Sequence, residues 1–269
     1  MGIIGKRLGE LHVALATPSD NPAFDPEPAD AQQVQAWIDG TQKLLATSLA
    51  LLEKNVDHLG DDAALLGRSI LDRKDKLVEA VSKLVKPDAH ALRTRIHGDF
   101  HLGQVLVSQG DAFLIDFEGE PARELEERRA KSSPLRDVAG LLRSLSYASA
   151  AAQSTMEAAP QMTADRKRAL FERFRAAAET FLDEYRAATE AAAQPLVAPE
   201  HEQALLDLFL IEKAAYEIRY EAANRPTWLG LPVRGLAALT SRLLGDTGAA
   251  PHSPAGAATP PEGSEGDYE

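Results

Sequence analysis

The stretch that decides the fold of this chain is IHGDFHLGQVLVSQGDAFLIDFEGE, residues 96–120. It places a carboxylate (Asp99), an amide (Gln104) and a second carboxylate (Asp116) around a turn. Gly110-Asp111 lies between two short apolar runs and is a β-hairpin turn signal. The stretch therefore predicts a small β-element that brings three polar side chains to one place.

These three side chains have the chemistry of a phosphoryl-transfer site. Asp99 follows Gly98, which permits an unusual backbone angle, and a carboxylate at such a turn can accept the proton of a substrate hydroxyl. Gln104 lies five residues later, the step between base and metal-binding amide in kinase catalytic loops. Asp116 offers the hard oxygen ligand that Mg²⁺ prefers. Each residue alone also fits a simple turn cap, so the combination carries the prediction.

Helical patterns flank this segment, which makes the predicted fold mainly α with a small β-hairpin (α+β). Apolar residues recur at three- and four-residue steps in most of the predicted helices. The predicted helices are 6–16, 30–59, 62–85, 135–153, 163–191, 200–223 and 232–244, and the predicted strands are 94–97, 105–108 and 112–117. The predicted units are a lobe over 1–245 and an acidic, disordered tail over 246–269. Within the lobe we expect a helical hairpin (30–86), a catalytic loop and metal-binding hairpin (94–120) and a helical substrate-binding part (133–245).

Composition excludes several classes of protein. The chain has 269 residues, no cysteine and a formal net charge of −12. Without cysteine there is neither a disulfide framework nor a thiolate metal site. The negative charge disfavours nucleic acid and anionic membranes as partners, and no apolar run is long enough for a spanning helix. We expect a soluble, cytoplasmic protein.

The longer motifs carry a resemblance to a known family. HGDFHLGQVL with FLIDFEGEP resembles the catalytic core of the aminoglycoside-phosphotransferase-like kinases, the small-molecule branch of the protein-kinase-like fold. IDFEGEPARELEERRAKSSPLRDVAGLLRSLSYA and EKAAYEIRYEAANRPTWLGLPVRGL resemble bacterial maltokinases, over roughly residues 5–245. Most of the wider group has Asn where this chain has Gln104, and maltokinases have Gln there. The resemblance implies phosphorylation of maltose by ATP to maltose 1-phosphate, which feeds glycogen and α-glucan synthesis.

The resemblance also implies roles for individual residues. Asp99 would be the catalytic base, and Gln104 and Asp116 would hold Mg²⁺ beside ATP. His97 and His101 would shape the turn, and for His101 a structural role competes with substrate contact. Glu118 would support the metal or pair with an arginine, and Asp137 would hydrogen-bond the backbone of the catalytic loop.

A second set of candidates lies on the helix predicted over 200–223. Glu212, Tyr216 and Tyr220 are spaced by four residues and share a helix face. Aromatic rings and carboxylates suit a disaccharide, whereas core-facing tyrosines are the competing interpretation. The resemblance implies substrate contact by Tyr216, Glu217, Tyr220 and Trp228.

The glycine-rich cover and strand lysine that hold ATP in kinases have no counterpart in the sequence. We therefore expect a fragment, a wrong start, or a subunit completed by another polypeptide, either a separate N-terminal lobe or a trehalose synthase. Two alternatives stay open: a kinase for another small hydroxyl substrate, and a non-catalytic lobe that binds a sugar or partner.

Overall fold

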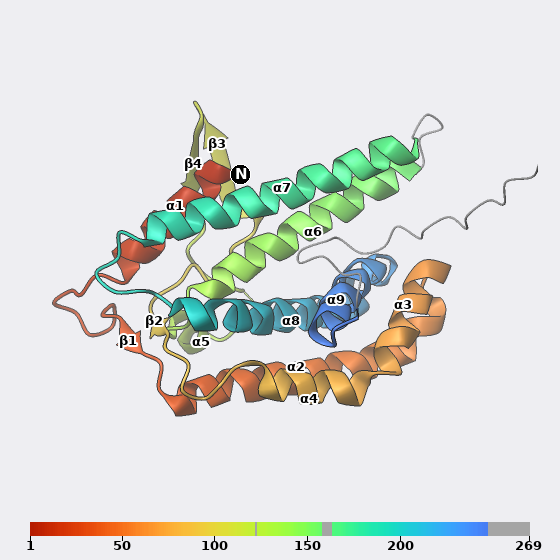
Figure 1. Cartoon of the computed structure of the whole chain (residues 1–269), viewed down its shortest axis with the longest axis horizontal. Helices are drawn as coiled ribbons and strands as arrows, with labels where there is room; N and C mark the ends of the chain where they lie inside the picture. The colour runs from red at the N-terminus through yellow and green to blue at the C-terminus, as the bar shows by residue number, and fades with distance from the viewer. Residues whose placement is uncertain (122, 158–162, 247–269) are drawn as a thin grey trace, which may run out of the picture.

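The computed structural model of the chain describes residues 1–121, 123–157 and 163–246 (Figure 1). Nearly all of the predicted tail, 247–269, lies outside the described residues. The described part is mainly helical with two small antiparallel sheets, which confirms the predicted α+β class. The proposed unit boundaries stay a prediction.

The helices are α1 (Gly2–Leu15), α2 (Ala31–Asn55), α3 (Asp61–Leu71), α4 (Lys74–Leu84), α5 (Leu125–Arg129), α6 (Leu135–Glu157), α7 (Ala164–Thr189), α8 (Pro199–Asn224) and α9 (Gly230–Leu243). Three short 3-10 turns cover Val56–His58, Leu102–Gln104 and Pro226–Trp228. β1 (Glu27–Pro28) pairs with β2 (Leu92–Arg93), and β3 (Val105–Ser108) pairs with β4 (Asp111–Leu114). The predicted strand at 94–97 is wrong: within it, Thr94 forms an isolated bridge to Ser132, and β2 ends one residue earlier.

Helix α8 forms the centre of the fold, between the α6–α7 layer and the α2–α4 layer (Figure 1). Its apolar residues are buried nearly all round, from Leu205 through Ile211 to Ile218. A helix that is apolar on all sides must be surrounded by protein. α8 accordingly contacts α2, α6 and α9, and it carries side chains into the pocket described below.

The helix predicted over 62–85 is two helices, because the chain breaks at Asp72 and Arg73. Arg73 folds back on the last turn of α3, where its Nε donates to the Ser69 carbonyl at 3.0 Å. The two halves then pack differently, α3 mainly against α9 and α4 mainly against α2. Apolar periodicity alone did not indicate the break, since it depends on these different packing partners.

The predicted hairpin is present, with its turn one residue earlier than expected. Gln109 and Gly110 both have positive φ, 51° and 80°, so they form the two central turn residues and β4 begins at Asp111. Arg7 on α1 donates to both carboxylate oxygens of Asp111, at 2.8 and 2.7 Å. This pairing lowers the pKa of Asp111 and fixes the hairpin to α1.

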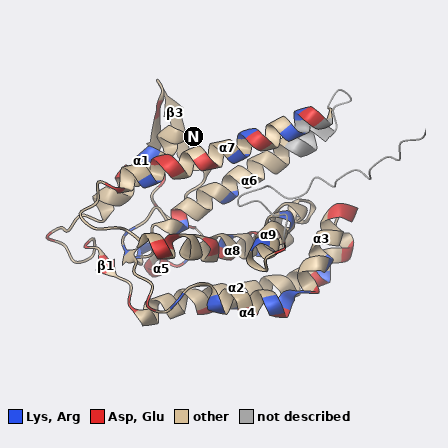
Figure 2. Cartoon of the chain, in the orientation of Figure 1, with Lys and Arg blue, Asp and Glu red and all other residues tan. Residues whose placement is uncertain are grey.

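The charged stretch that follows Glu124 forms the short helix α5 (Leu125–Arg129), and its residues are mostly exposed. Along α7, acidic and basic residues alternate (Figure 2). None of the helices in the described residues is long and apolar enough to cross a membrane.

Helix α1 lies directly on α7 because two glycines remove the side chains between them. A Cβ added at Gly5 would lie 2.2 Å from the Phe181 carbonyl oxygen, and one at Gly9 would lie 2.6 Å from the Ala188 Cβ. Both distances are shorter than atoms can approach, so these positions require glycine.

We expect Gly5→Ala to lower the free energy of unfolding by about 1–3 kcal/mol, because the new methyl group must push the backbones of α1 and α7 apart. Gly40→Ala on α2 is the matched control, since nothing lies within 4 Å of the added Cβ. It should raise stability by about 0.5–1 kcal/mol through helix propensity. Urea unfolding of both variants measures this, and equal stability of Gly5→Ala and wild type would contradict the packing argument.

Candidate functional site

The loop His97-Gly98-Asp99 is held in place by the buried carboxylate of Asp137 on α6. Asp137 Oδ2 accepts from the His97 backbone N–H at 2.7 Å, and Oδ1 accepts from the Gly98 N–H at 2.9 Å. Gly98 has a φ of 84°, in the left-handed region that favours glycine. The turn and its anchor together set the direction in which the Asp99 side chain leaves the loop.

A second buried contact extends this anchor to α1 and α7. His12 on α1 is fully buried; its Nε2 lies 3.1 Å from Asp137 Oδ2, and its Nδ1 lies 2.9 Å from the Tyr185 hydroxyl on α7. A carboxylate only accepts, so His12 donates through Nε2; in the neutral form of the ring, Nδ1 then accepts from the Tyr185 hydroxyl. Burial raises the pKa of Tyr185, which keeps that hydroxyl protonated.

His97 connects the loop to the end of β4. Its Nε2 donates to the Ile115 carbonyl at 2.8 Å, and its ring packs against Phe100 and Phe117. This contact brings the Asp99 turn next to the segment that carries Asp116. His97 therefore joins the turn to the end of β4, and its role in shaping a catalytic loop stays a prediction.

The structure brings the three predicted chemical groups together. Gln104 Nε2 donates to Asp116 Oδ2 at 3.0 Å. His101 lies between Gln104 and Asp99: its Nε2 is 3.4 Å from Gln104 Nε2 and 3.9 Å from Asp99 Oδ2. Asp116 has a φ of 65°, a strained angle for a residue other than glycine, of the kind that collects at functional sites.

The side-chain oxygens of Gln104 and Asp116 would suit a magnesium ion whose remaining ligands are water and phosphate oxygens. Among the described residues, no group of three or more His, Cys, Asp or Glu side chains is placed to hold a metal. Mg²⁺ usually takes one or two protein oxygens and completes its shell with water and phosphate oxygens. Glu118 is exposed, and its backbone carbonyl rather than its carboxylate accepts from Arg128.

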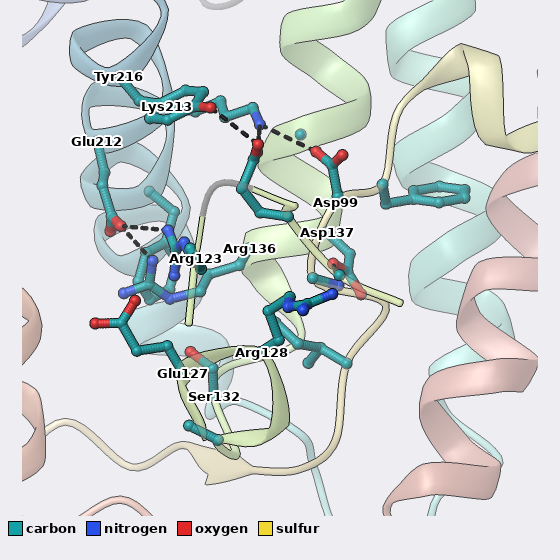
Figure 3. A pocket seen from close by; sticks show the side chains of 18 of the residues that line it. Asp99, Arg123, Glu127, Arg128, Ser132, Arg136, Asp137, Glu212, Lys213 and Tyr216 are labelled. Carbon is teal, nitrogen blue, oxygen red and sulfur yellow. Dashed lines mark hydrogen bonds and ion pairs between the residues drawn. The ribbon is translucent and has the colours of Figure 1, made fainter. Parts of the chain in front are cut away.

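A pocket of about 390 Å³ opens beside Asp99 (Figure 3). It lies between the loop that carries Asp99, the segment after β4 and α8, and Trp37 and Leu44 of α2 form part of its wall. The charged residues that line it are Asp99, Glu120, Arg123, Glu127, Arg128, Lys131, Arg136, Asp137, Glu212 and Lys213. Small-molecule sites are typically concave and of this size or larger, about 300–1,000 Å³.

Of the predicted sugar-contacting residues, Tyr216 lines this pocket and the other three lie outside its lining. Glu217 is buried against Arg143, whose Nε and Nη2 both donate to Glu217 Oε2, at 3.0 and 2.5 Å. Tyr220 and Trp228 are exposed, and the Arg225 guanidinium carbon lies 5.4 and 5.1 Å from the centres of their rings. Substrate contact by these three stays a prediction.

Two residues that the sequence did not single out, Lys213 and Glu120, lie at the centre of the pocket. Lys213 Nζ is 3.5 Å from Asp99 Oδ1 and 3.8 Å from Glu120 Oε2 (Figure 3). The Tyr216 hydroxyl donates to the other oxygen of Glu120 at 3.0 Å. Lys213 precedes Tyr216 by three residues, and this spacing on one helix face could have indicated it.

Comparison with known proteins finds relatives that are named glucosamine kinase. The chain is 28% identical over 236 residues to a glucosamine kinase of Mycolicibacterium smegmatis (strain ATCC 700084 / mc(2)155), covering 88% of this chain and 52% of that protein. It is 38% identical over 52 residues to a glucosamine kinase of Streptacidiphilus jiangxiensis, a match that covers 12% of the latter. The chain thus spans about half the length, or less, of the curated relatives it matches. No family model matches it.

Solved structures give the same description. A glucosamine kinase in complex with glucosamine, ADP and inorganic phosphate superposes with a TM-score of 0.69 at 24% identity. The superposition covers 91% of this chain and 55% of that structure, and another crystal form of glucosamine kinase gives a TM-score of 0.67. The likeness confirms the kinase-like fold predicted from the sequence.

We expect Asp137→Asn to destabilise the chain by about 1–3 kcal/mol. An amide has one acceptor atom where the carboxylate has two, so at least one of the buried donors on His97, Gly98 or His12 loses its partner. Thermal or urea unfolding measures the loss. Asp183→Asn, at an exposed position of α7, is the control and should change little. A stable Asp137→Asn variant would contradict the anchoring role.

Proposed function

We propose that this chain is the substrate-binding and base-carrying part of an ATP-dependent sugar kinase. The observation that carries the proposal is the position of Asp99, at the wall of a pocket of small-molecule size and linked through His101 to the Gln104–Asp116 pair. The names of the relatives and the fold of the solved glucosamine kinases support it.

The residues of the chain suggest how the transfer proceeds. Asp99 would accept the proton of the attacking sugar hydroxyl, and that oxygen would then form a bond to the γ-phosphorus of ATP while ADP leaves. Gln104 and Asp116 would hold Mg²⁺, which supplies positive charge to the phosphates when bound. Asp137 acts indirectly, by fixing the loop backbone so that the direction of Asp99 does not depend on the substrate.

The sugar itself is a finer proposal. The sequence motifs favour maltose and the product maltose 1-phosphate, whereas the relatives are named for glucosamine. The volume of the pocket, about 390 Å³, is compatible with either sugar. An ATP-binding N-terminal lobe, on the same or a separate polypeptide, is part of the proposal, as is a cytoplasmic location.

Asp99→Asn, in the chain completed with an ATP-binding N-terminal lobe, should abolish turnover and leave sugar binding within a few-fold of wild type. A positioned general base contributes about 10²–10⁴-fold to rate, so a loss of at least about 100-fold in kcat is expected. Coupled detection of ADP measures turnover, and calorimetry measures sugar affinity. Wild-type turnover in Asp99→Asn would refute the base assignment, and Asp183→Asn serves as the control.

A panel of maltose, glucose, glucosamine and an aminoglycoside, assayed with the same completed protein, tests the substrate. Phosphorylation of one of the sugars is the expected result, and phosphorylation of the aminoglycoside alone would replace the proposal with a different kinase. The completed protein also tests the non-catalytic alternative, by calorimetry with the sugar and by the ADP assay. That alternative gains support if the completed protein binds sugar and releases no ADP.

A further inference from the structure

Lys213 occupies a position inside the pocket that a positively charged substrate group would otherwise take. Its ammonium lies between the carboxylates of Asp99 and Glu120, 3.5 and 3.8 Å away. These three side chains are between 14% and 28% exposed, so solvent screens their charges only in part. The reacting corner of the pocket therefore already contains a cation.

Glu120 and Lys213 are both held by Tyr216. The Tyr216 hydroxyl donates to Glu120 Oε1 at 3.0 Å, and Lys213 Nζ lies 5.0 Å from the centre of the Tyr216 ring. Burial, with the nearby Glu120 carboxylate, raises the pKa of Tyr216, so the hydroxyl stays a donor. The Lys213 ammonium is thus surrounded by two carboxylates, Asp99 and Glu120, and by the ring of Tyr216.

Another carboxylate of the pocket, Glu212, is already paired with arginine. Five acidic side chains (Asp99, Glu120, Glu127, Asp137 and Glu212) and five basic ones (Arg123, Arg128, Lys131, Arg136 and Lys213) line the pocket, and Lys131 also pairs with Glu27 outside this lining. Glu212, which could otherwise attract a cation, pairs with Arg136 and lies 3.9 Å from Arg123. A site that selects an ammonium group would need a carboxylate free to receive it.

We propose that Lys213 makes this pocket select neutral sugars over amino sugars that carry an ammonium group. The inference rests on the proposed sugar-kinase function and names the substrate class of the same pocket. A glucosammonium ion that places its amine near Asp99 or Glu120 must displace Lys213 or accept a like charge close by. A hydroxyl at that position can instead accept a hydrogen bond from the Lys213 ammonium. The chain would then differ in preferred substrate from the relatives named glucosamine kinase.

Glucose and glucosamine form the matched pair of probes, because they differ by one hydroxyl against one amine. Calorimetry with the full chain at about pH 6, where a primary amine of this kind is protonated, gives both Kd values. Wild type should bind glucose more tightly than glucosamine. Lys213→Met should shift the ratio of the two Kd values at least about tenfold towards glucosamine. Two unit charges about 4 Å apart in a partly buried site interact by more than the energy that a tenfold change requires.

Two control variants separate the local charge from other effects. Lys213→Arg keeps the charge and should keep the preference for glucose. Lys43→Met removes a positive charge from an exposed position of α2, and its ratio should equal that of wild type. If Lys213→Met does not fold, Lys213→Gln replaces it, and the wild-type ratio by itself still decides the direction of the preference.

The possible outcomes distinguish this inference from the function on which it rests. Tighter binding of glucosamine than glucose by wild type overturns the role of Lys213, and so does an unchanged ratio in the folded Lys213→Met variant. In both cases the sugar pocket itself stands. Failure of wild type to bind maltose, glucose or glucosamine at all overturns the proposed function together with the inference.

Discussion

One buried carboxylate, Asp137, connects the loop that carries Asp99 to helix α1. It accepts hydrogen bonds from the backbone of His97 and Gly98, and from the His12 ring on α1. A buried carboxylate is costly unless every oxygen is satisfied, so the three donors and their elements must assemble together. Through Tyr185 the same network reaches α7. The orientation of Asp99 is therefore a property of the helical core rather than of a free loop.

The site that results has two sides with different physical character. On one side, the Gln104 amide nitrogen donates to Asp116, and the proposed magnesium ion would take one oxygen from each of these side chains and complete its shell with phosphate and water. On the other side, the pocket is lined by balanced charges, and Lys213 and Glu120 lie beside Asp99. Asp99 lies next to both sides, close to Lys213 on one and to His101 on the other, which is the position that the proposed base requires.

Features that depend on neighbouring residues could be predicted from the sequence, whereas features that depend on contacts between distant residues could not. The hairpin was predictable because its turn chemistry and its two apolar runs are local. Its turn lies one residue earlier than predicted, and β4 ends at Leu114, three residues before the predicted end of that strand. The single helix expected over 62–85 was wrong because the break at Asp72 and Arg73 reflects different partners for its two halves. The burial of Glu217 against Arg143 could not be predicted from the sequence, because the two residues are 74 positions apart in the chain.

The sequence by itself determined the α+β class and the hairpin, and it predicted Asp99, Gln104 and Asp116 as site residues, since motif spacing and turn residues are written in consecutive positions. Only the tertiary structure decided which charges face Asp99. Lys213 and Glu120 come from α8 and from the segment after β4, and their meeting depends on how the central helix packs. Charge pairs depend on distances of a few ångströms in space, and a linear pattern of residues does not specify those distances.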